Sequence, residues 1–441
     1  MARQRSVLLL VCMIALATLW ACRLPKICIY NQCNTDIIKG PVPQNHIDLS
    51  RADSPFIGWP LERVCSETSW TPGVVFVCDN NSGGIGNIRN YILTCVRYGI
   101  EAGVTGLVLP QIKTRSETDL SSLSNPHRDF DYFFDEQHFQ RSLKSACPRM
   151  VIYNTTDDIP NVPEPFKAEQ FTPRNLGRRG GCDQRDLNKH TDRFGKQFQA
   201  HLDSTAEEFK LPAPSLARPR ILRFTWGVQW DWPVYRDGPE FVATFGGLLR
   251  FRSDILELGK RTTAYMRNFS IRHEVQGGAF AGMHLRTEND ALGNWPKFDD
   301  QSGAYLRRAA SMGLKAAYLA TGNKTEADKL TAAARSIHGI AVITKHDLLK
   351  DHPADLAALE ALTWDQQALI DFIVLLESEY FLGVSPSSFS MNVALKRHLK
   401  AEGLHTRPWR VGGDGDGRSW LVGNYEKYWD DWLFMYDSLW P

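Results

Sequence analysis

The sequence predicts an α/β protein with two Rossmann-like, doubly wound domains that face a crevice. Apolar runs at 74–78 and 104–109 flank a helical pattern at 88–102, which together form a strand–helix–strand unit. In the second half, expected strands alternate with helical patterns of about 10–15 residues, as in a parallel sheet covered by helices. With 441 residues and 43% hydrophobic content, the chain is long enough for two such domains.

Residues 1–25 are predicted to form a cytoplasmic tip and a signal anchor. After Arg3 and Arg5, the run from Val7 to Cys22 carries no charge, and Arg23 follows it. This run is slightly short for a bilayer span, which needs about 20 apolar residues, so a cleaved signal peptide is the alternative. No clean Ala-x-Ala cleavage site follows, however, and the balanced flanking charges do not set the orientation.

Glycosylation sequons favour a lumenal position for the rest of the chain. They begin at Asn80, Asn154, Asn268 and Asn323. We therefore expect a single-pass protein of the endoplasmic reticulum or Golgi membrane with its C-terminal bulk in the lumen. The net charge of +1 argues against nucleic acid as a partner.

The nine cysteines all lie within the first 182 residues, so disulfides would crosslink only the N-terminal half. Their spacings fit no common zinc pattern, and their connectivity stays open. Asp414-Gly415-Asp416-Gly417 looks like a metal motif, but its turn-rich setting favours a surface loop. We therefore predict no metal site.

The remaining organisation follows from local patterns. Residues 26–70 lack periodicity and are predicted to be a stem, followed by domains at 71–262 and 263–412. Residues 413–441 form an aromatic tail with helical spacing, expected to pack back onto the protein rather than to stack on carbohydrate.

Within the first domain, a third strand is expected at 150–153. Residues 155–220, rich in Pro, Gly and charge, indicate an excursion from the core. In the second domain, strands and helices are expected in alternation, with strands at 279–286, 314–320, 340–344 and 380–384, and helices at 302–313, 324–338, 364–378 and 388–402.

Charged side chains follow the strand expected at 279–286, in the order His284, Arg286, Glu288 and Asp290. At the carboxyl end of a parallel strand, such groups face the crevice where open α/β sheets bind ligands. Arg286 offers a planar fork suited to phosphate oxygens. A salt-bridged strand end is the alternative.

Two strand-to-helix junctions offer further ligand groups. Gly84-Ile85-Gly86-Asn87 lets the backbone approach an anion at a helix start, without the spacing of a nicotinamide fingerprint. Ser387, Ser388 and Phe389 precede another helix, where Ser387 could cap the helix or help to cradle phosphate. Asp371, in an apolar helix, needs a partner such as a purine N–H edge, an internal arginine or a helix cap.

These blocks resemble the GDP-fucose protein O-fucosyltransferase superfamily, including its large plant branch. The likeness runs discontinuously from about residue 74 to 400, through 83–87, 130–139, 248–259, 284–290, 318–322 and 371–397. Two departures stand out. Ala291 to Trp295 replaces the Ser-Gly-Cys that often follows the plant signature, and residues 155–240 match poorly, which leaves the acceptor open.

The resemblance implies a GT-B fold and inverting transfer of fucose from GDP-fucose to a hydroxyl of a protein or glycan. It implies no metal or other cofactor. The first domain would be acceptor-side and the second would bind the nucleotide sugar. From the first domain, the implied donor site includes Gly84, Ile85, Gly86 and Asn87. From the second domain it includes His284 and Arg286 on phosphate, Asp371 on guanine, and Ser388 and Phe389 beside the diphosphate.

For catalysis, Arg286 would stabilise the leaving diphosphate. Glu288 lies on the same side of an extended segment and is our candidate base. Asp290 shares that side, and either carboxylate could instead pair with His284 or Arg286. Another deoxysugar donor such as UDP-rhamnose, or a catalytically silent lumenal binding protein, are the competing hypotheses.

Overall fold

The computed structural model describes residues 47–116, 126–162, 168–176, 189–225, 232, 234–291, 293, 295–400, 416–427 and 438–441. These residues fall in one compact unit, Ile47–Pro441. The predicted signal anchor lies outside the described residues. Among the helices that are described, none is long and apolar enough to cross a membrane.

The first half contains a five-stranded sheet in the order β5-β2-β1-β7-β6, and every neighbouring pair in it is parallel. Its strands are β1 (Thr71–Val77), β2 (Val104–Val108), β5 (Val151–Tyr153), β6 (Glu169–Phe171) and β7 (Arg220–Phe224). Helix α3 (Ile85–Ala102) joins β1 to β2 and ends at Gly103, whose φ of 68° a residue with a side chain rarely adopts. The predicted strand–helix–strand unit is confirmed.

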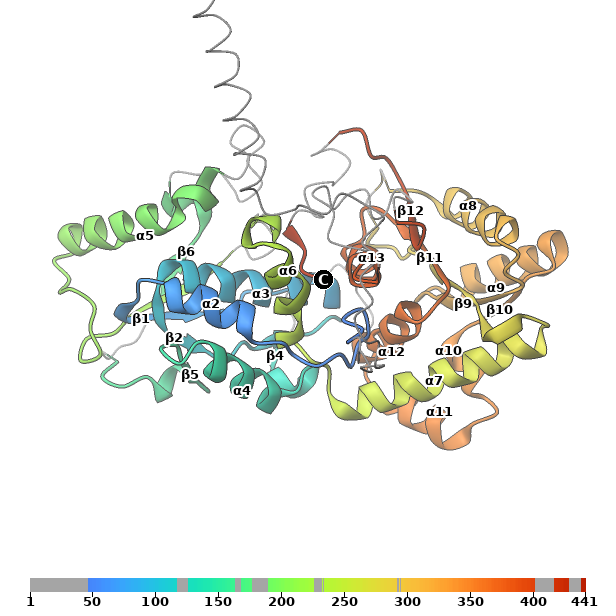
Figure 1. Ribbon diagram of the computed structural model, residues 1–441, viewed down its shortest axis with the longest axis horizontal. Helices are drawn as coiled ribbons and strands as arrows, with labels where there is room; N and C mark the ends of the chain where they lie inside the picture. Colours follow the sequence, from blue (N-terminus) through green and yellow to red (C-terminus); the bar gives the residue numbers. More distant parts are fainter. Residues whose placement is uncertain are drawn as a thin grey trace, which may run out of the picture. The chain divides into compact units, whose positions relative to one another are not determined.

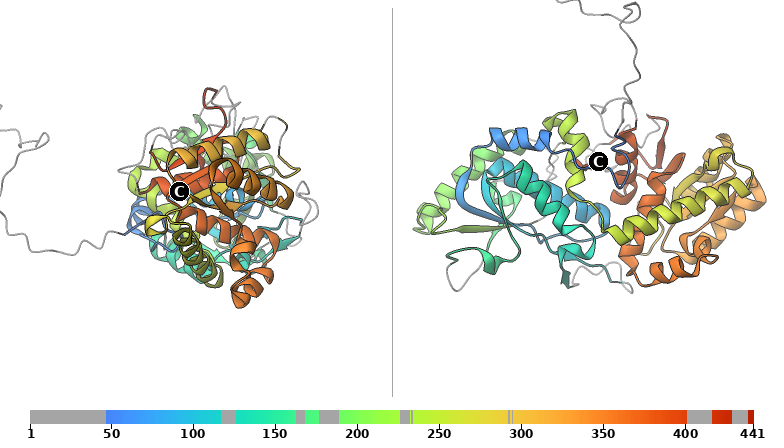
Figure 2. Two further views of the ribbon diagram at one scale, coloured as in Figure 1. Left: turned by 90° about the vertical axis from the view of Figure 1, so that its right-hand side faces the viewer. Right: turned by 60° about the horizontal axis from the view of Figure 1, so that its bottom comes forward.

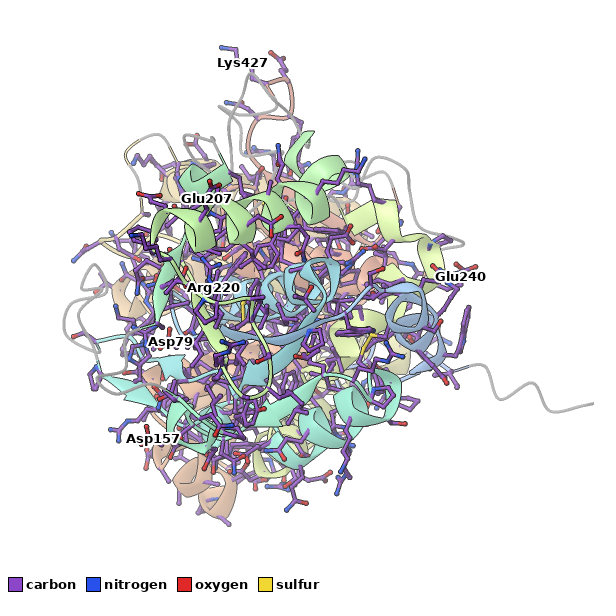
Figure 3. All side chains as sticks on the ribbon, turned by 90° about the vertical axis from the view of Figure 1, so that its left-hand side faces the viewer. Asp79, Asp157, Glu207, Arg220, Glu240 and Lys427 are labelled. Carbon is purple, nitrogen blue, oxygen red and sulfur yellow. A yellow bond between two sulfur atoms is a disulfide. The ribbon has the colours of Figure 1, made fainter. Side chains whose placement is uncertain are left out.

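Helix α5 (Lys189–Glu208) lies within the segment that we expected to be an excursion. Its Phe194, Phe198 and Leu202 recur at every fourth position and are buried in the main core. Strand β7 follows α5 and contains Arg220, which is labelled in Figure 3. Arg220 pairs with Glu169 of β6 at 2.7 Å. The expectation was therefore wrong for the part of 155–220 that is described, because one apolar face is hidden within a charged sequence.

The second half contains another parallel five-stranded sheet, in the order β10-β9-β8-β11-β12. Its strands are β8 (Ala281–His284), β9 (Ala316–Ala320), β10 (Ala341–Ile343), β11 (Tyr380–Val384) and β12 (Ser419–Val422). The first four confirm the predicted strands. The fifth corrects the prediction of a helical tail, because residues 419–422 extend the sheet instead.

Helices cover both faces of this second sheet. On one face, alternate side chains of the strands pack with α8 and α9 in a separate apolar cluster. On the other face, the remaining strand side chains pack with α7, α12 and α13 in the main core. The helices of this half are α7 (Ser253–Arg272), α8 (Phe298–Ser311), α9 (Lys324–Ala333), α10 (Lys345–Leu349), α11 (Pro353–Glu360), α12 (Trp364–Leu376) and α13 (Ser388–His398). Helices α10 and α11 were not predicted.

Helices α7 and α12 lie side by side (Figures 1 and 2). A Cβ on Gly259 of α7 would stand 2.6 Å from the Ile373 side chain of α12, so only glycine permits this approach. The predicted domain boundary at 262/263 falls inside α7.

The end of the predicted stem is folded rather than extended. It contains α2 (Trp59–Glu67), and Cys65 of that helix forms a disulfide with Cys147. A second disulfide joins Cys78 to Cys95, which resolves part of the cysteine pairing. At the other end of the chain, Trp440 is buried against Phe241 and Phe245.

The remaining elements are short connections. The helices and strands among them are β3 (Ile112–Lys113), β4 (His127–Arg128), α4 (Glu136–Ala146) and α6 (Pro239–Phe245). The single-turn helices are η1 (Phe130–Tyr132), η2 (Thr156–Asp158), η3 (Pro173–Leu176), η5 (Val234–Asp237), η6 (Gly246–Leu248), η7 (Gln276–Gly278) and η8 (Ala334–His338).

Candidate functional site

The candidate site lies where the strand order of the second sheet reverses. Strand β8 connects through α8 to β9 on one side, whereas the neighbouring β11 connects through α13 to β12 on the other. Ligands of open α/β sheets bind at the carboxyl ends of such strands. In this chain, His284 ends β8, and Ser387 and Ser388 follow β11.

Arg286 is held by two carboxylates. Its Nη1 lies 2.6 Å from Glu288 Oε2, and its Nη2 lies 2.6 Å from Asp290 Oδ1. Its main chain is fixed as well, because the Arg286 N–H donates to Gln301 Oε1 at 2.9 Å and Gln301 Nε2 donates back to the Arg286 carbonyl. The ion-paired strand end that the sequence left open is therefore present, with the guanidinium already oriented.

Glu288 does not have the surroundings of a general base. Oε1 accepts the Gly322 N–H at 2.8 Å, while Oε2 holds Arg286. Burial would raise the pKa of Glu288, but the charge of Arg286 and the Gly322 hydrogen bond outweigh it, and the pKa is lowered. An efficient base has a pKa near the working pH. The geometry instead supports the alternative in which Glu288 pairs with Arg286.

His284 is a buried, neutral imidazole. Burial lowers its pKa to about 4. Nδ1 lies 2.7 Å from Ser390 Oγ, and that oxygen also accepts the Val384 N–H at 3.2 Å. Since the Ser390 oxygen accepts from Val384, its hydroxyl proton is available for Nδ1. When that hydroxyl donates to Nδ1, the proton of the neutral ring lies on Nε2, where it can donate to an anion.

The glycine loop meets the second half at the start of α3. A Cβ on Gly86 would stand 2.7 Å from the Ser388 carbonyl carbon, and Asn392 Nδ2 donates to the carbonyls of both residues, at 3.4 and 2.8 Å. The N-terminal turns of α3 and α13 therefore pack directly on each other. Gly86 is required by this contact, which the sequence did not predict.

The other members of the loop divide into buried and accessible groups. The Ile85 side chain is buried in the core, so only its main chain could meet a ligand. Gly84 and Asn87 are partly exposed. Gly83, with φ of 89°, packs against the Asn87 side chain, which fixes the turn.

At the start of α13, Ser387 caps the helix, with its hydroxyl 3.5 Å from the Ser390 N–H. Ser388 and Phe389 are partly buried, and the Phe389 ring lies 4.6 Å from the ring of His284. The structure therefore brings His284, Ser387, Ser388 and Phe389 together with the loop at Gly86.

Asp371 is paired inside the protein. Oδ1 accepts from the Tyr318 hydroxyl and Oδ2 from Lys345 Nζ, each at 2.7 Å, and the side chain is buried. An internal partner was one of the alternatives that the sequence allowed, and this partner is a lysine. The assignment of Asp371 to guanine stays a prediction.

Sequence reasoning missed Arg115, which follows β3 in the first half. Its Nη2 lies 2.5 Å from Asp290 Oδ2, so Asp290 bridges Arg115 and Arg286. Its main-chain N–H donates to Oδ2 of Asp365, in the first turn of α12, at 3.3 Å. The available signal was its place shortly after the second strand of the first sheet, on the same edge as the glycine loop.

The described residues contain no group of three His, Cys, Asp or Glu side chains that could hold a metal ion. Asp416, expected in a surface loop, has a buried side chain that binds His398 Nδ1 at 3.0 Å. A pocket of about 490 Å³ lies elsewhere, between α7, α12 and the segment at Arg51. No predicted site residue lines it.

Comparison with protein families identifies the family of the chain's central part. The family described as GDP-fucose protein O-fucosyltransferase matches residues 75–400. Comparison with curated proteins gives no match.

Several solved structures are similar at low identity. POFUT1 in complex with GDP-fucose is 17% identical with a TM-score of 0.45, over 75% of this chain and 96% of that one. Fucosyltransferase NodZ from Bradyrhizobium is 16% identical with a TM-score of 0.34, over 74% and 93%. An Arabidopsis thaliana FUT1 mutant in complex with GDP is 12% identical with a TM-score of 0.37, over 77% and 71%.

Proposed function

Because the chain belongs to the GDP-fucose protein O-fucosyltransferase family, and is therefore a glycosyltransferase, we propose that it transfers fucose from GDP-fucose to a hydroxyl of a protein or glycan. Transfer inverts the configuration at the anomeric carbon and needs no metal. The donor binds between the glycine loop and the strand ends of β8 and β11, in a GT-B arrangement of the two sheets.

The observation that supports this proposal most directly is the position of Arg286. Its guanidinium follows the central strand of the second sheet, and its main chain is fixed on both sides by Gln301. Charge develops on the leaving diphosphate during transfer. A guanidinium oriented in advance stabilises that charge without having to reorganise, which is where such groups accelerate a reaction most.

Two neighbouring groups complete the phosphate side of the site. In the tautomer that accepts from Ser390, His284 donates from Nε2, and the N–H groups at the start of α13 attract an anion. Glu288 and Asp290 are held by arginines, with their pKa values lowered. We therefore assign most of the catalytic effect to stabilisation of the leaving group rather than to a strong base.

We also propose that the protein is anchored in the endoplasmic reticulum or Golgi membrane by residues 1–25, with its bulk in the lumen. The disulfides Cys65–Cys147 and Cys78–Cys95 support an oxidising compartment. Protease treatment of sealed microsomes tests this topology. Digestion of the bulk without detergent would rule it out.

The donor is tested with the purified chain, using GDP-fucose and UDP-rhamnose in parallel. We expect consumption of GDP-fucose alone, an inverted anomeric product by NMR, and activity that survives EDTA. Consumption of UDP-rhamnose alone would replace the proposed donor. Binding of GDP without consumption of either sugar nucleotide, even with a broad acceptor mixture, would favour the silent binding protein.

A further inference from the structure

Asp290 lies between two arginines that come from different halves of the chain. Its Oδ1 is 2.6 Å from Arg286 Nη2, and its Oδ2 is 2.5 Å from Arg115 Nη2. Each oxygen of one carboxylate thus takes one guanidinium. All three side chains are largely buried, with 13 to 14% of each exposed. The Asp290 carboxylate therefore occupies guanidinium N–H donors that a phosphate group would also bind.

Arg115 also reaches the glycine loop. Its Nη1 lies 3.8 Å from the point where a Cβ on Gly84 would stand. Its main chain is fixed by Asp365, and its guanidinium lies 5.8 Å from the ring centre of Trp364. The Arg115 side chain therefore lies between Asp290, which binds Arg286, and the helix start that belongs to the proposed donor site.

We propose that Asp290 is an internal stand-in for the diphosphate of a nucleoside-diphosphate sugar, and that Arg115 becomes a diphosphate ligand when the donor displaces it. This inference rests on the proposed function. A diphosphate carries more negative charge than a carboxylate and offers more acceptor oxygens, so it competes for the same N–H groups. Glu288 stays on Nη1 of Arg286 and keeps that side chain oriented during the exchange.

The competing explanation is that Arg115 and Asp290 form a static link between the two halves. The two explanations predict opposite signs for one substitution. In a static link, loss of either partner loosens the site, and both losses weaken donor binding. In the exchange, removing Asp290 frees the arginines and tightens donor binding, because the binding-competent fraction rises.

The experiment is calorimetric titration of the full chain with GDP and, separately, with inorganic pyrophosphate. Arg115→Gln should raise Kd roughly 10- to 100-fold, the range expected for a lost hydrogen bond to a charged group. Asp290→Asn should lower Kd roughly three- to tenfold. Arg128→Gln is the matched control, because Arg128 is exposed on the neighbouring strand β4, and its Kd should not change.

The outcomes separate cleanly. Weaker binding in both Arg115→Gln and Asp290→Asn, or no change in either, overturns the inference. Thermal unfolding identifies a misfolded variant, and Arg115→Lys then replaces Arg115→Gln, with a smaller loss expected. Opposite signs with pyrophosphate but no binding of GDP would keep the inference and refute the proposed donor. Transfer from GDP-fucose with unchanged Kd in both variants would do the reverse.

Discussion

The two sheets place their first strand at the centre, yet they differ in how the last two strands are added. The second sheet has its strands in the chain order 3-2-1-4-5, whereas the first has the order 3-2-1-5-4, because β6 precedes β7 in the chain but lies at the edge. The point where the order reverses is beside the first strand in both. The main chain of a glycine loop follows β1, whereas charged side chains follow β8.

This difference is clearest in two arginines. Arg97 in the first half binds Asp237 through Nε and Nη2, at 3.0 and 2.6 Å, and stacks 4.0 Å from the Trp232 ring. Arg286 in the second half also binds carboxylates, but it shares one of them with Arg115. The first pair is satisfied within its own half, whereas the second is part of a chain of charges that joins the two halves.

The largest effect is expected for Arg97→Met. The change leaves Asp237 buried without its arginine, and breaking such a pair costs about 3–5 kcal/mol in the free energy of unfolding. Turnover per folded molecule should not change. Denaturant unfolding and active-site titration measure the two quantities. A fall in turnover without loss of stability would erase the distinction between the two arginines.

Arg286→Ala should behave in the opposite way. Loss of one oriented charge-stabilising group lowers the rate by roughly 10²–10³-fold. Arg286→Lys should fail almost as badly, because the lysine keeps the charge but lacks the fork. Both variants should remain folded, because Glu288 keeps the Gly322 N–H and Asp290 keeps Arg115 as partners. Steady-state kinetics on GDP-fucose check this, and near wild-type transfer by folded Arg286→Ala would show that the active site is elsewhere.

These two arginines also show what the sequence could predict. Arg286 follows a short apolar strand, so the local pattern was enough to place it at the carboxyl end of that strand. Arg115 touches Asp290, which is 175 residues away. No local pattern reports such a contact, because it depends on how the two sheets pack. For the same reason, Lys345 as the partner of Asp371 and Ser388 as the neighbour of Gly86 appeared only with the structure.

The fold was predicted to a similar depth. Strands β1, β2, β8 and β11 are mostly apolar and mostly buried, as is typical of a parallel sheet covered on both faces. Strand β7 was missed because Arg220 and Arg223 interrupt its apolar pattern. In the structure each arginine is paired with a carboxylate, Arg220 with Glu169 and Arg223 with Asp79. The sequence cannot show that a charge in a strand has a partner across the sheet.

A third effect concerns His284 and pH. Its pKa is lowered to about 4 in the folded protein by burial, against an ordinary value of 6.5. Between these values the unfolded chain binds a proton that the folded protein does not, so stability falls as the pH is lowered through this window. The loss should reach about 3 kcal/mol near pH 4.

Denaturant unfolding of wild type and His284→Gln from pH 7.5 to 4 measures this contribution as the difference between them. In the first half, His201 is only half-buried, and its pKa is lowered by burial and by the charge of Arg220. His201→Gln should therefore remove a smaller part of the pH dependence. Equal contributions from the two histidines would contradict the burial of His284.

The smallest effect tests whether α13 begins at a phosphate site or is only capped there. Ser387→Ala should cost about 1 kcal/mol of stability, because the cap of α13 is lost. Ser387→Asp should restore the cap, since aspartate accepts the same N–H, but it adds negative charge where the diphosphate would bind. Stability and affinity for GDP should therefore separate in this variant, with Kd raised severalfold.

The matched control is the cap of α4 in the first half, where Asp135 accepts the His138 N–H at 2.9 Å. Asp135→Ser exchanges the same two residues in the reverse direction, at a helix that contributes none of the predicted site residues. Both stability and Kd for GDP should be nearly unchanged. If Ser387→Asp also leaves Kd unchanged, the start of α13 is a structural cap like that of α4, and the diphosphate is held by the arginines without it.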